Sequence, residues 1–240
     1  MTTLAKITIG LLIALLAASC GLDISIGEGK KGNGVVQEDR REITGEFTVV
    51  SASEGLDVTV TQADDYEIVV EADENVIDLI GTDIRDGKLK IHAIKNIGRA
   101  TKKVHVSLPV ITGLESSSGA DLVTKGKVQA DRITLDASSG SELRLDLMAD
   151  DVQADTSSGA DIRITGEANI FHADASSGSG IRARDFSVKN CIAEASSGAD
   201  IDLFVSESLT ADASSGGNIS YAGEPRLQER KSLSGSVHKN

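Results

Sequence analysis

Apolar and polar residues alternate along most of the chain from Phe47 onward. Leu56, Val58 and Val60 are separated by polar residues, and the same alternation recurs in GKLKIHAI (87–94) and KKVHVSLP (102–109). A period of two is typical of strands with one buried face, and Asp86-Gly87 is a tight-turn signal. Residues 44–113 are therefore predicted to be strand-rich, with a short helical pattern only around 74–80.

The second half of the chain repeats a Ser-Ser-Gly motif at intervals of 21, 19, 19, 20 and 18 residues. Fainter copies occur at 53–57 and 234–237. Residues three, five and seven positions before each glycine, and three positions after it, are mostly apolar or small, whereas the positions between them are mostly polar. The seventh position before the glycine carries Thr112, Ile133, Val152, Phe171, Cys191 and Leu209. The pattern predicts two strands per repeat, one on each side of a corner.

A repeat of ~19 residues cannot enclose a core alone, so repeats must stack and share one interior. We expect an all-β fold, a parallel β-helix-like solenoid over 114–223 with a closing segment at 224–240. A nucleophilic serine needs one base and one oxyanion pocket, whereas these serines recur six times. The glycines are therefore interpreted as structural corners that need positive φ: Gly119, Gly140, Gly159, Gly178, Gly198 and Gly216.

The N-terminus has the features of an export signal. Lys6 precedes an apolar run, Ile7 to Ala18, that is too short to cross a bilayer of about 30 Å. Residues 1–19 are predicted to be a signal peptide. The sequence that ends at Cys20 resembles the lipobox of bacterial lipoproteins, which implies cleavage before Cys20, lipidation of its thiol and a membrane tether. Simple secretion is the alternative.

Residues 20–43 mix glycine with charge and show no sustained period, so they are predicted to be a flexible linker. Gly27 to Gly32 matches the dinucleotide-binding pattern G-x-G-x-x-G in letters only. The required strand before it and helix after it are missing from the pattern, so the linker interpretation is preferred.

Charge and cysteine content restrict the function classes. The formal net charge is −13, and removing Lys6 with the signal peptide makes it −14, which argues against a nucleic-acid partner. Cys191 is the only cysteine after Cys20, so the mature domain has no intrachain disulfide. It lies in an inward column and is expected to be a buried thiol. The few aromatic residues argue against an aromatic-lined glycan groove.

Two charged columns are candidate sites. Asp136, Asp155 and Asp174 stack at one repeat position and would suit a bridging Ca²⁺ ion, although a solvated acidic edge is the simpler interpretation. A second column would suit an anionic surface polymer, although ion pairs with neighbouring acids are the simpler interpretation. This column contains Arg144, Arg163 and Arg182. The four histidines are scattered and predict no transition-metal site.

The chain resembles the family known as "putative auto-transporter adhesin, head GIN domain" over about residues 46–239. The resemblance is carried by 53–72, 87–91, 106–121 and 220–235, in that order, together with the repeated corners. It implies a right-handed β-helix-like fold and a place in the cell envelope. It implies no catalytic residues.

Taken together, these features predict a non-enzymatic, lipid-anchored envelope protein that presents a rigid β-solenoid for adhesion or surface binding. Its expected place is the outer membrane of a Gram-negative bacterium, with the membrane as one partner and a surface polysaccharide or protein as the other. Two alternatives are a structural role in envelope assembly and a polysaccharide-acting enzyme, which the short, uniform coils disfavour. No cofactor other than Ca²⁺ is considered, and the oligomeric state is left open.

Overall fold

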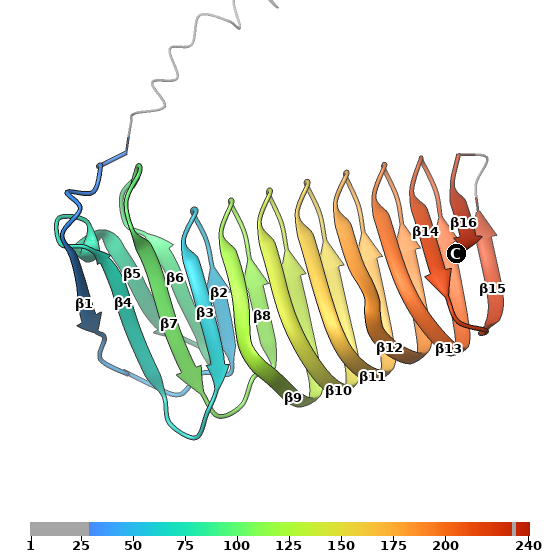
Figure 1. The fold of residues 1–240 in the computed structure, drawn as a ribbon, viewed down its shortest axis with the longest axis horizontal. Coiled ribbons are helices and arrows are strands. Elements are labelled where there is room, and N and C mark those ends of the chain that lie inside the picture. The colour runs from blue at the N-terminus through green and yellow to red at the C-terminus, as the bar shows by residue number, and fades with distance from the viewer. Residues whose placement is uncertain (1–28, 232–233) are drawn as a thin grey trace, which may run out of the picture.

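The computed structural model describes residues 29–231 and 234–240. These residues form a β-solenoid of strands β1 to β16 with one 3-10 helix, η2 (Ile77–Leu79), inside the stretch where the sequence has a short helical pattern (Figure 1). Equivalent residues of successive coils are about 19 positions apart, as in the pairs Leu143 with Ile162 and Ile162 with Ile181. The all-β solenoid prediction is confirmed.

Five long strands wrap around the solenoid, and each begins in one sheet, bends near its middle and ends in the other sheet. Figure 1 shows these bends along the lower edge of the molecule. The long strands are β9 (Asp121–Ala137), β10 (Glu142–Thr156), β11 (Asp161–Ala175), β12 (Gly180–Ala195) and β13 (Asp200–Ala213). Their pairing is parallel and nearly continuous.

The two sheets are named here the front sheet and the back sheet. The front sheet contains the first parts of β9 to β13 with β1 (Val36–Arg40), β4 (Glu67–Asp73), β7 (Lys102–Leu108), β3 (Asp57–Gln62), β14 (Asn218–Ala222) and β16 (Ser236–Lys239). The back sheet contains the last parts of β9 to β13 with β5 (Ile80–Arg85), β6 (Lys88–Ala93), β2 (Val49–Ala52), β8 (Gly113–Ser116) and β15 (Arg226–Lys231).

The core lies between the two sheets and consists of the predicted inward columns. Side chains three positions after each corner glycine are at most 1% exposed, from Leu122 to Ile219. Burying each such Leu or Ile contributes about 1.5–3 kcal/mol. Thr112 is the exception among the predicted inward positions: it is exposed and donates a hydrogen bond to Thr48, and the neighbouring Ile111 is buried instead.

The Ser-Ser-Gly corners are tight turns with two consecutive residues of positive φ. In one of them Ser158 has φ 55°, Gly159 has φ 72°, and the Ala160 N–H donates to the Ser157 carbonyl at 3.2 Å. These features define a type I′ turn. The Gly159 N–H also donates to the Ser177 carbonyl of the next corner at 3.2 Å, so the backbone ladder continues from coil to coil through the corners.

The hydroxyls that join the corners belong to buried serines next to the exposed Ser-Gly pair. Ser141 Oγ donates to the Ser116 carbonyl at 2.7 Å, and Ser179 Oγ donates to Thr156 Oγ1 at 2.9 Å. Ser158 and Gly159 themselves are exposed. The corner serines therefore have a structural part in the turn, and the buried hydroxyls link neighbouring coils.

The N-terminal part closes one end of the solenoid with mixed pairing. The β2–β3 unit turns at Glu54-Gly55 and lies between β8/β9 and β6/β7, to which it pairs in parallel. Strand β1 pairs antiparallel with β4, and β4 with β7. The flexible-linker prediction is therefore wrong for 36–40. The side chains of β1 are mostly exposed and its backbone pairs with β4, so the strand needs no hydrophobic pattern of its own.

Residues 224–240, predicted to be a closing segment, continue the coils of the solenoid. Strand β15 pairs with β13, and β16 pairs with β14, both in parallel. Val237 packs partly against the core, which agrees with the faint repeat in the sequence at 234–237.

Candidate functional site

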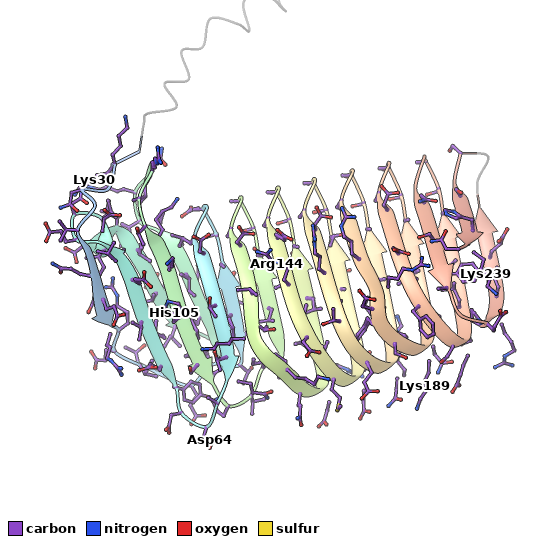
Figure 2. All side chains as sticks on the ribbon, in the orientation of Figure 1. Lys30, Asp64, His105, Arg144, Lys189 and Lys239 are labelled. Carbon is purple, nitrogen blue, oxygen red and sulfur yellow. The ribbon has the colours of Figure 1, made fainter. Side chains whose placement is uncertain are left out.

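The front sheet presents two adjacent rows of charged side chains. The first row lies two positions after the corner glycine and contains Asp121, Glu142, Asp161 and Asp200, with Gly180 in register between the last two. The second row contains Arg144, Arg163 and Arg182, followed by Asp202. We name the three arginines the arginine row; Arg144 is labelled in Figure 2.

Each arginine reaches the carboxylate of the preceding coil. Arg163 Nε lies 3.0 Å from Glu142 Oε1, and Arg182 lies 3.4 Å from Asp161 Oδ1. Arg144 lies farther, at 3.9 Å, from Asp121 Oδ1. The arginine side chains are 48–61% exposed, so solvent screens these pairs and each stabilises the fold by at most about 1 kcal/mol. A guanidinium has five N–H donors, so such a pair leaves donors directed toward solvent.

The glycine that interrupts the acidic residues of the front sheet leaves a small polar hollow. A Cβ at Gly180 would lie 2.6 Å from Asp161 Oδ1, so the Asp161 carboxylate occupies the space that a side chain at Gly180 would need. Asp161, Arg182, Asp200 and Asp202 line the hollow. In the sequence, this hollow corresponds to Gly180, which stands where the neighbouring repeats have Asp161 and Asp200.

The predicted calcium residues lie on the opposite face, in a row of six carboxylates along the back sheet. The row is in register through Glu115, Asp136, Asp155, Asp174, Glu194 and Asp212, and we name it the acidic row. Lys88 Nζ lies 2.5 Å from Glu115 at one end.

Burial and mutual repulsion both act on the acidic row. The pKa of Asp136 is raised mainly by partial burial and then by the charges of Glu115 and Asp155. The pKa of Asp174 is raised by partial burial and by Asp155. Within residues 29–231 and 234–240, no three His, Cys, Asp or Glu side chains are placed to hold a metal ion together. Calcium binding by Asp136, Asp155 and Asp174 therefore stays a prediction.

A shallow groove runs beside the acidic row and involves side chains that the sequence pattern did not single out. Thr134, Gln153, His172 and Ile192 form the next outward row, and they line the groove with Asp155, Asp174 and Glu194. Arg132 ends the groove and contacts Asp151 at 2.9 Å. In the sequence, this row can be recognised as the outward position six residues before each corner glycine.

The remaining titratable candidates are dispersed. His92 and His105 lie on separate strands, 3.7 Å from Asp83 and 3.4 Å from Glu71 respectively. Cys191 is buried between the sheets, and burial raises the pKa of its thiol far above the ordinary value. A neutral, buried thiol is a poor nucleophile.

The predicted signal peptide and Cys20 lie outside the described residues. In the part of the chain that the structure does describe, no helix has the length and apolar character needed to span a bilayer.

Solved structures with the same fold come from Bacteroides and Parabacteroides species. A Bacteroides fragilis structure described as a putative adhesin has a TM-score of 0.80 and 17% identity, covering 88% of this chain and 100% of that one. A Parabacteroides distasonis structure described as a putative lipid binding protein has a TM-score of 0.73 and 18% identity, covering 88% and 98%. A putative adhesin from Parabacteroides merdae has a TM-score of 0.70 and 18% identity, covering 89% and 99%.

These identities are low, so the similarity shows a shared fold. A comparison with curated proteins gives no match. The family described as "putative auto-transporter adhesin, head GIN domain" matches residues 46–225, which include the strand-rich N-terminal part and all six Ser-Ser-Gly corners. Because this family model covers most of the chain, the chain belongs to the head GIN domain family.

Proposed function

We propose that the protein is a non-enzymatic, lipid-anchored component of the cell envelope whose β-solenoid acts as an adhesin or surface-binding module. The observation that carries the proposal is the arginine row beside the acidic residues of the front sheet. These side chains repeat in register with a spacing of about 4.8 Å between coils, on a scaffold held by continuous backbone pairing. The adhesin description of the family supports the same class of function.

The front sheet suits a linear, acidic polymer that also carries hydroxyl groups. Arginine donors can bind carboxylate or sulfate groups of such a chain in a bidentate manner. The neighbouring carboxylates Glu142 and Asp161 can accept hydrogen bonds from hydroxyls. An acidic polysaccharide has both groups, so it is the ligand class that we propose for this face.

The proposed location rests on the lipobox-like sequence that ends at Cys20. Lipidation of Cys20 would tether the domain to the membrane, and we propose the outer membrane of a Gram-negative cell. The description of the Parabacteroides distasonis structure as lipid-binding is compatible with a membrane-associated relative. On the back sheet, we propose that Ca²⁺ bridges neighbouring carboxylates of the acidic row.

The binding proposal is tested by replacing the arginine row. A variant with Arg144→Ser, Arg163→Ser and Arg182→Ser should lose binding on an array of acidic glycans and on intact cells, by at least tenfold. The matched control replaces three exposed cations away from the front sheet: Arg132→Ser, Lys189→Ser and Arg226→Ser.

The control variant has the same change in net charge, so it should bind as the parent protein does. Equal binding by the parent and the arginine-row variant, or an equal loss in both variants, would contradict the proposal. Release of unsaturated sugars from an acidic polysaccharide by the parent protein would contradict its non-enzymatic part.

A second candidate function is end-to-end assembly, and the sheet edges favour it. Strands β1 and β5 form the outer edges at one end, and β15 and β16 form those at the other end. An edge strand carries backbone groups that can pair with another chain. This arrangement would suit a structural role in the envelope.

A further inference from the structure

Exposed basic side chains gather at the end of the solenoid where the chain enters the described structure. Lys30 and Lys31 precede β1, and Lys95 and Arg99 lie in the loop between β6 and β7. All four are exposed. We name these four residues the basic tip. Figure 1 shows the loop before β7 projecting beside the entering chain, and Figure 2 labels Lys30 at this end of the molecule.

Backbone hydrogen bonds hold the two segments of the basic tip together. The Lys30 N–H donates to the Asn96 carbonyl at 3.0 Å, and the Gly98 N–H donates back to the Lys30 carbonyl at 3.1 Å. The Gly32 N–H donates to the Arg99 carbonyl at 3.0 Å. Residues about 65 positions apart in sequence thus form one basic surface, which no local pattern could indicate.

The nearest carboxylates are occupied by other donors. The Asp73 carboxylate is almost buried and accepts the backbone N–H groups of Thr101, at 2.6 Å, and Gly34. Glu74 accepts hydrogen bonds from Asn33 and Gln37. Among the described residues, Lys30, Lys95 and Arg99 form no ion pair with a carboxylate. The positive charges of Lys30, Lys95 and Arg99 are therefore not neutralised by these acids.

An apolar side chain accompanies the charges. Ile94 directly precedes Lys95 and is 58% exposed, the largest exposure of any large hydrophobic side chain among the described residues. Cations combined with an exposed aliphatic side chain are typical of surfaces that lie against lipid headgroups. The rest of the protein is strongly acidic, with a net charge of −13 for the whole chain.

We propose that the basic tip binds the phosphate groups of an anionic membrane leaflet and so orients the solenoid on the surface to which it is anchored. The Debye length in physiological salt is about 8 Å, so the tip interacts with the membrane with little influence from distant carboxylates. From Cys20 to Gly29 the chain spans at most about 30 Å when fully extended. This tether, which rests on the proposed lipid at Cys20, keeps the tip near the membrane.

The test uses the mature chain, residues 20–240, with Cys20→Ser so that no lipid contributes to binding. Co-sedimentation is measured with vesicles of equimolar phosphatidylglycerol and phosphatidylcholine, and with vesicles of phosphatidylcholine alone. Each basic residue near an anionic surface strengthens binding about fivefold, so a variant with Lys30→Gln, Lys95→Gln and Arg99→Gln should bind the anionic vesicles about 100-fold more weakly.

The matched control is the variant with Arg132→Gln, Lys189→Gln and Arg226→Gln, three exposed cations outside both the basic tip and the arginine row. It has the same net charge and should bind within about twofold of the parent. Raised salt should release the parent from anionic vesicles. Circular dichroism checks that each variant is folded. The proposal is overturned if the parent shows no preference for anionic vesicles, or if both variants lose binding equally. Lipidation of Cys20 is measured separately, by mass spectrometry of the native protein. The absence of the lipid anchor is therefore distinguishable from a failure of the basic tip to bind anionic lipid.

Discussion

At each corner the backbone conformation of two residues decides which side chains are tolerated. Gly159 has φ 72°, and a Cβ atom added to it would meet no other atom within 4 Å, so its requirement is conformational and not steric. Ser158 has φ 55°, a region that an L-residue other than Gly, Asn or Asp seldom adopts. The Ser-Gly pair is therefore a strained version of the Asn-Gly pair that type I′ turns prefer.

Because of this strain, substitutions at these two neighbouring residues should change the free energy of unfolding in opposite directions. Gly159→Ala should lower the free energy of unfolding by about 1–2 kcal/mol, because alanine is disfavoured at this φ. Ser158→Asn should raise it by several tenths of a kcal/mol, since asparagine tolerates positive φ. Urea unfolding followed by circular dichroism measures both changes. Destabilisation by both substitutions, to the same extent, would argue against backbone strain as the cause.

Asp155 lies between Asp136 and Asp174 in the acidic row, and its charge raises the pKa of both. A carboxyl whose pKa is higher in the folded state than in the unfolded state gains a proton on folding at intermediate pH. This effect makes the fold more stable as the pH falls through the raised pKa toward the ordinary value of 3.8, and less stable at neutral pH.

Asp155→Asn should therefore lower the pKa of Asp136 and Asp174 and should weaken this dependence of stability on pH. Carboxyl ¹³C titrations by NMR measure the two pKa values directly. Asp161→Asn, which changes a carboxylate on the front sheet, should leave both values unchanged. If Asp155→Asn leaves both pKa values at their raised positions, the charge of Asp155 is not a cause of the shifts. Titrations repeated with calcium chloride test the proposed Ca²⁺ site, which should lower both pKa values.

Among the elements, β11 and β12 show how neighbouring strands share the core. Phe171 of β11 and Phe186 of β12 are both fully buried, with ring centroids 5.4 Å apart in an edge-to-face arrangement at 85°. Cys191 pairs with Phe171 in register and is 3% exposed. A coil with a large aromatic side chain thus lies beside one with a small thiol in the same column, which keeps the interior filled.

Truncation of Phe171 should leave a cavity that neighbouring coils cannot fill. Phe171→Ala should cost about 3–5 kcal/mol of unfolding free energy, measured by denaturant titration. It should also speed alkylation of Cys191 by a thiol reagent, because the less stable fold opens more often and exposes the buried thiol. The control is Phe204→Ala, at a side chain 36% exposed, which should cost much less. Similar costs at both positions would contradict the shared dry interior.

At the scale of the whole molecule, the two ends of the solenoid differ from each other. The N-terminal end has antiparallel pairs, β1 with β4 and β5 with β6, and it carries the basic tip. The C-terminal end continues the parallel pairing of the coils through β15 and β16. Any assembly through edges would therefore begin most readily at β15 and β16, where the ladder can be extended without a change of direction.

A proline at the C-terminal edge tests this assembly. If molecules associate end to end, light scattering of the parent protein should show a mass that rises with concentration. Val237→Pro removes a backbone N–H of β16 and should abolish that rise. Val36→Pro in β1 tests the edge at the other end: association between opposite ends should be abolished by either proline, and association between two C-terminal ends only by Val237→Pro. A mass equal to one chain at every concentration would exclude this second candidate function.

The sequence alone determined the repeat length, the inward columns and the corners. A period of two and a spacing of about 19 residues force successive coils to stack in register, because each apolar column can be buried only against its copies. The inward burial of Ile162 and Ile181 and the positive φ of Gly159 followed from that rule. Thr112 departed from it where the chain enters the first regular coil.

Only the tertiary structure decided the features that depend on residues far apart in the chain. β1 pairs with β4 although 20–43 shows no period, and the basic tip joins Lys30 to the loop before β7. The arginine row and its ion pairs with neighbouring acids were predicted from the sequence, but only the structure showed that Arg163 and Arg182 contact carboxylates one coil earlier, at 3.0 and 3.4 Å. Local patterns report which side of a strand faces the core, whereas pairing between distant segments depends on the closure of the whole chain.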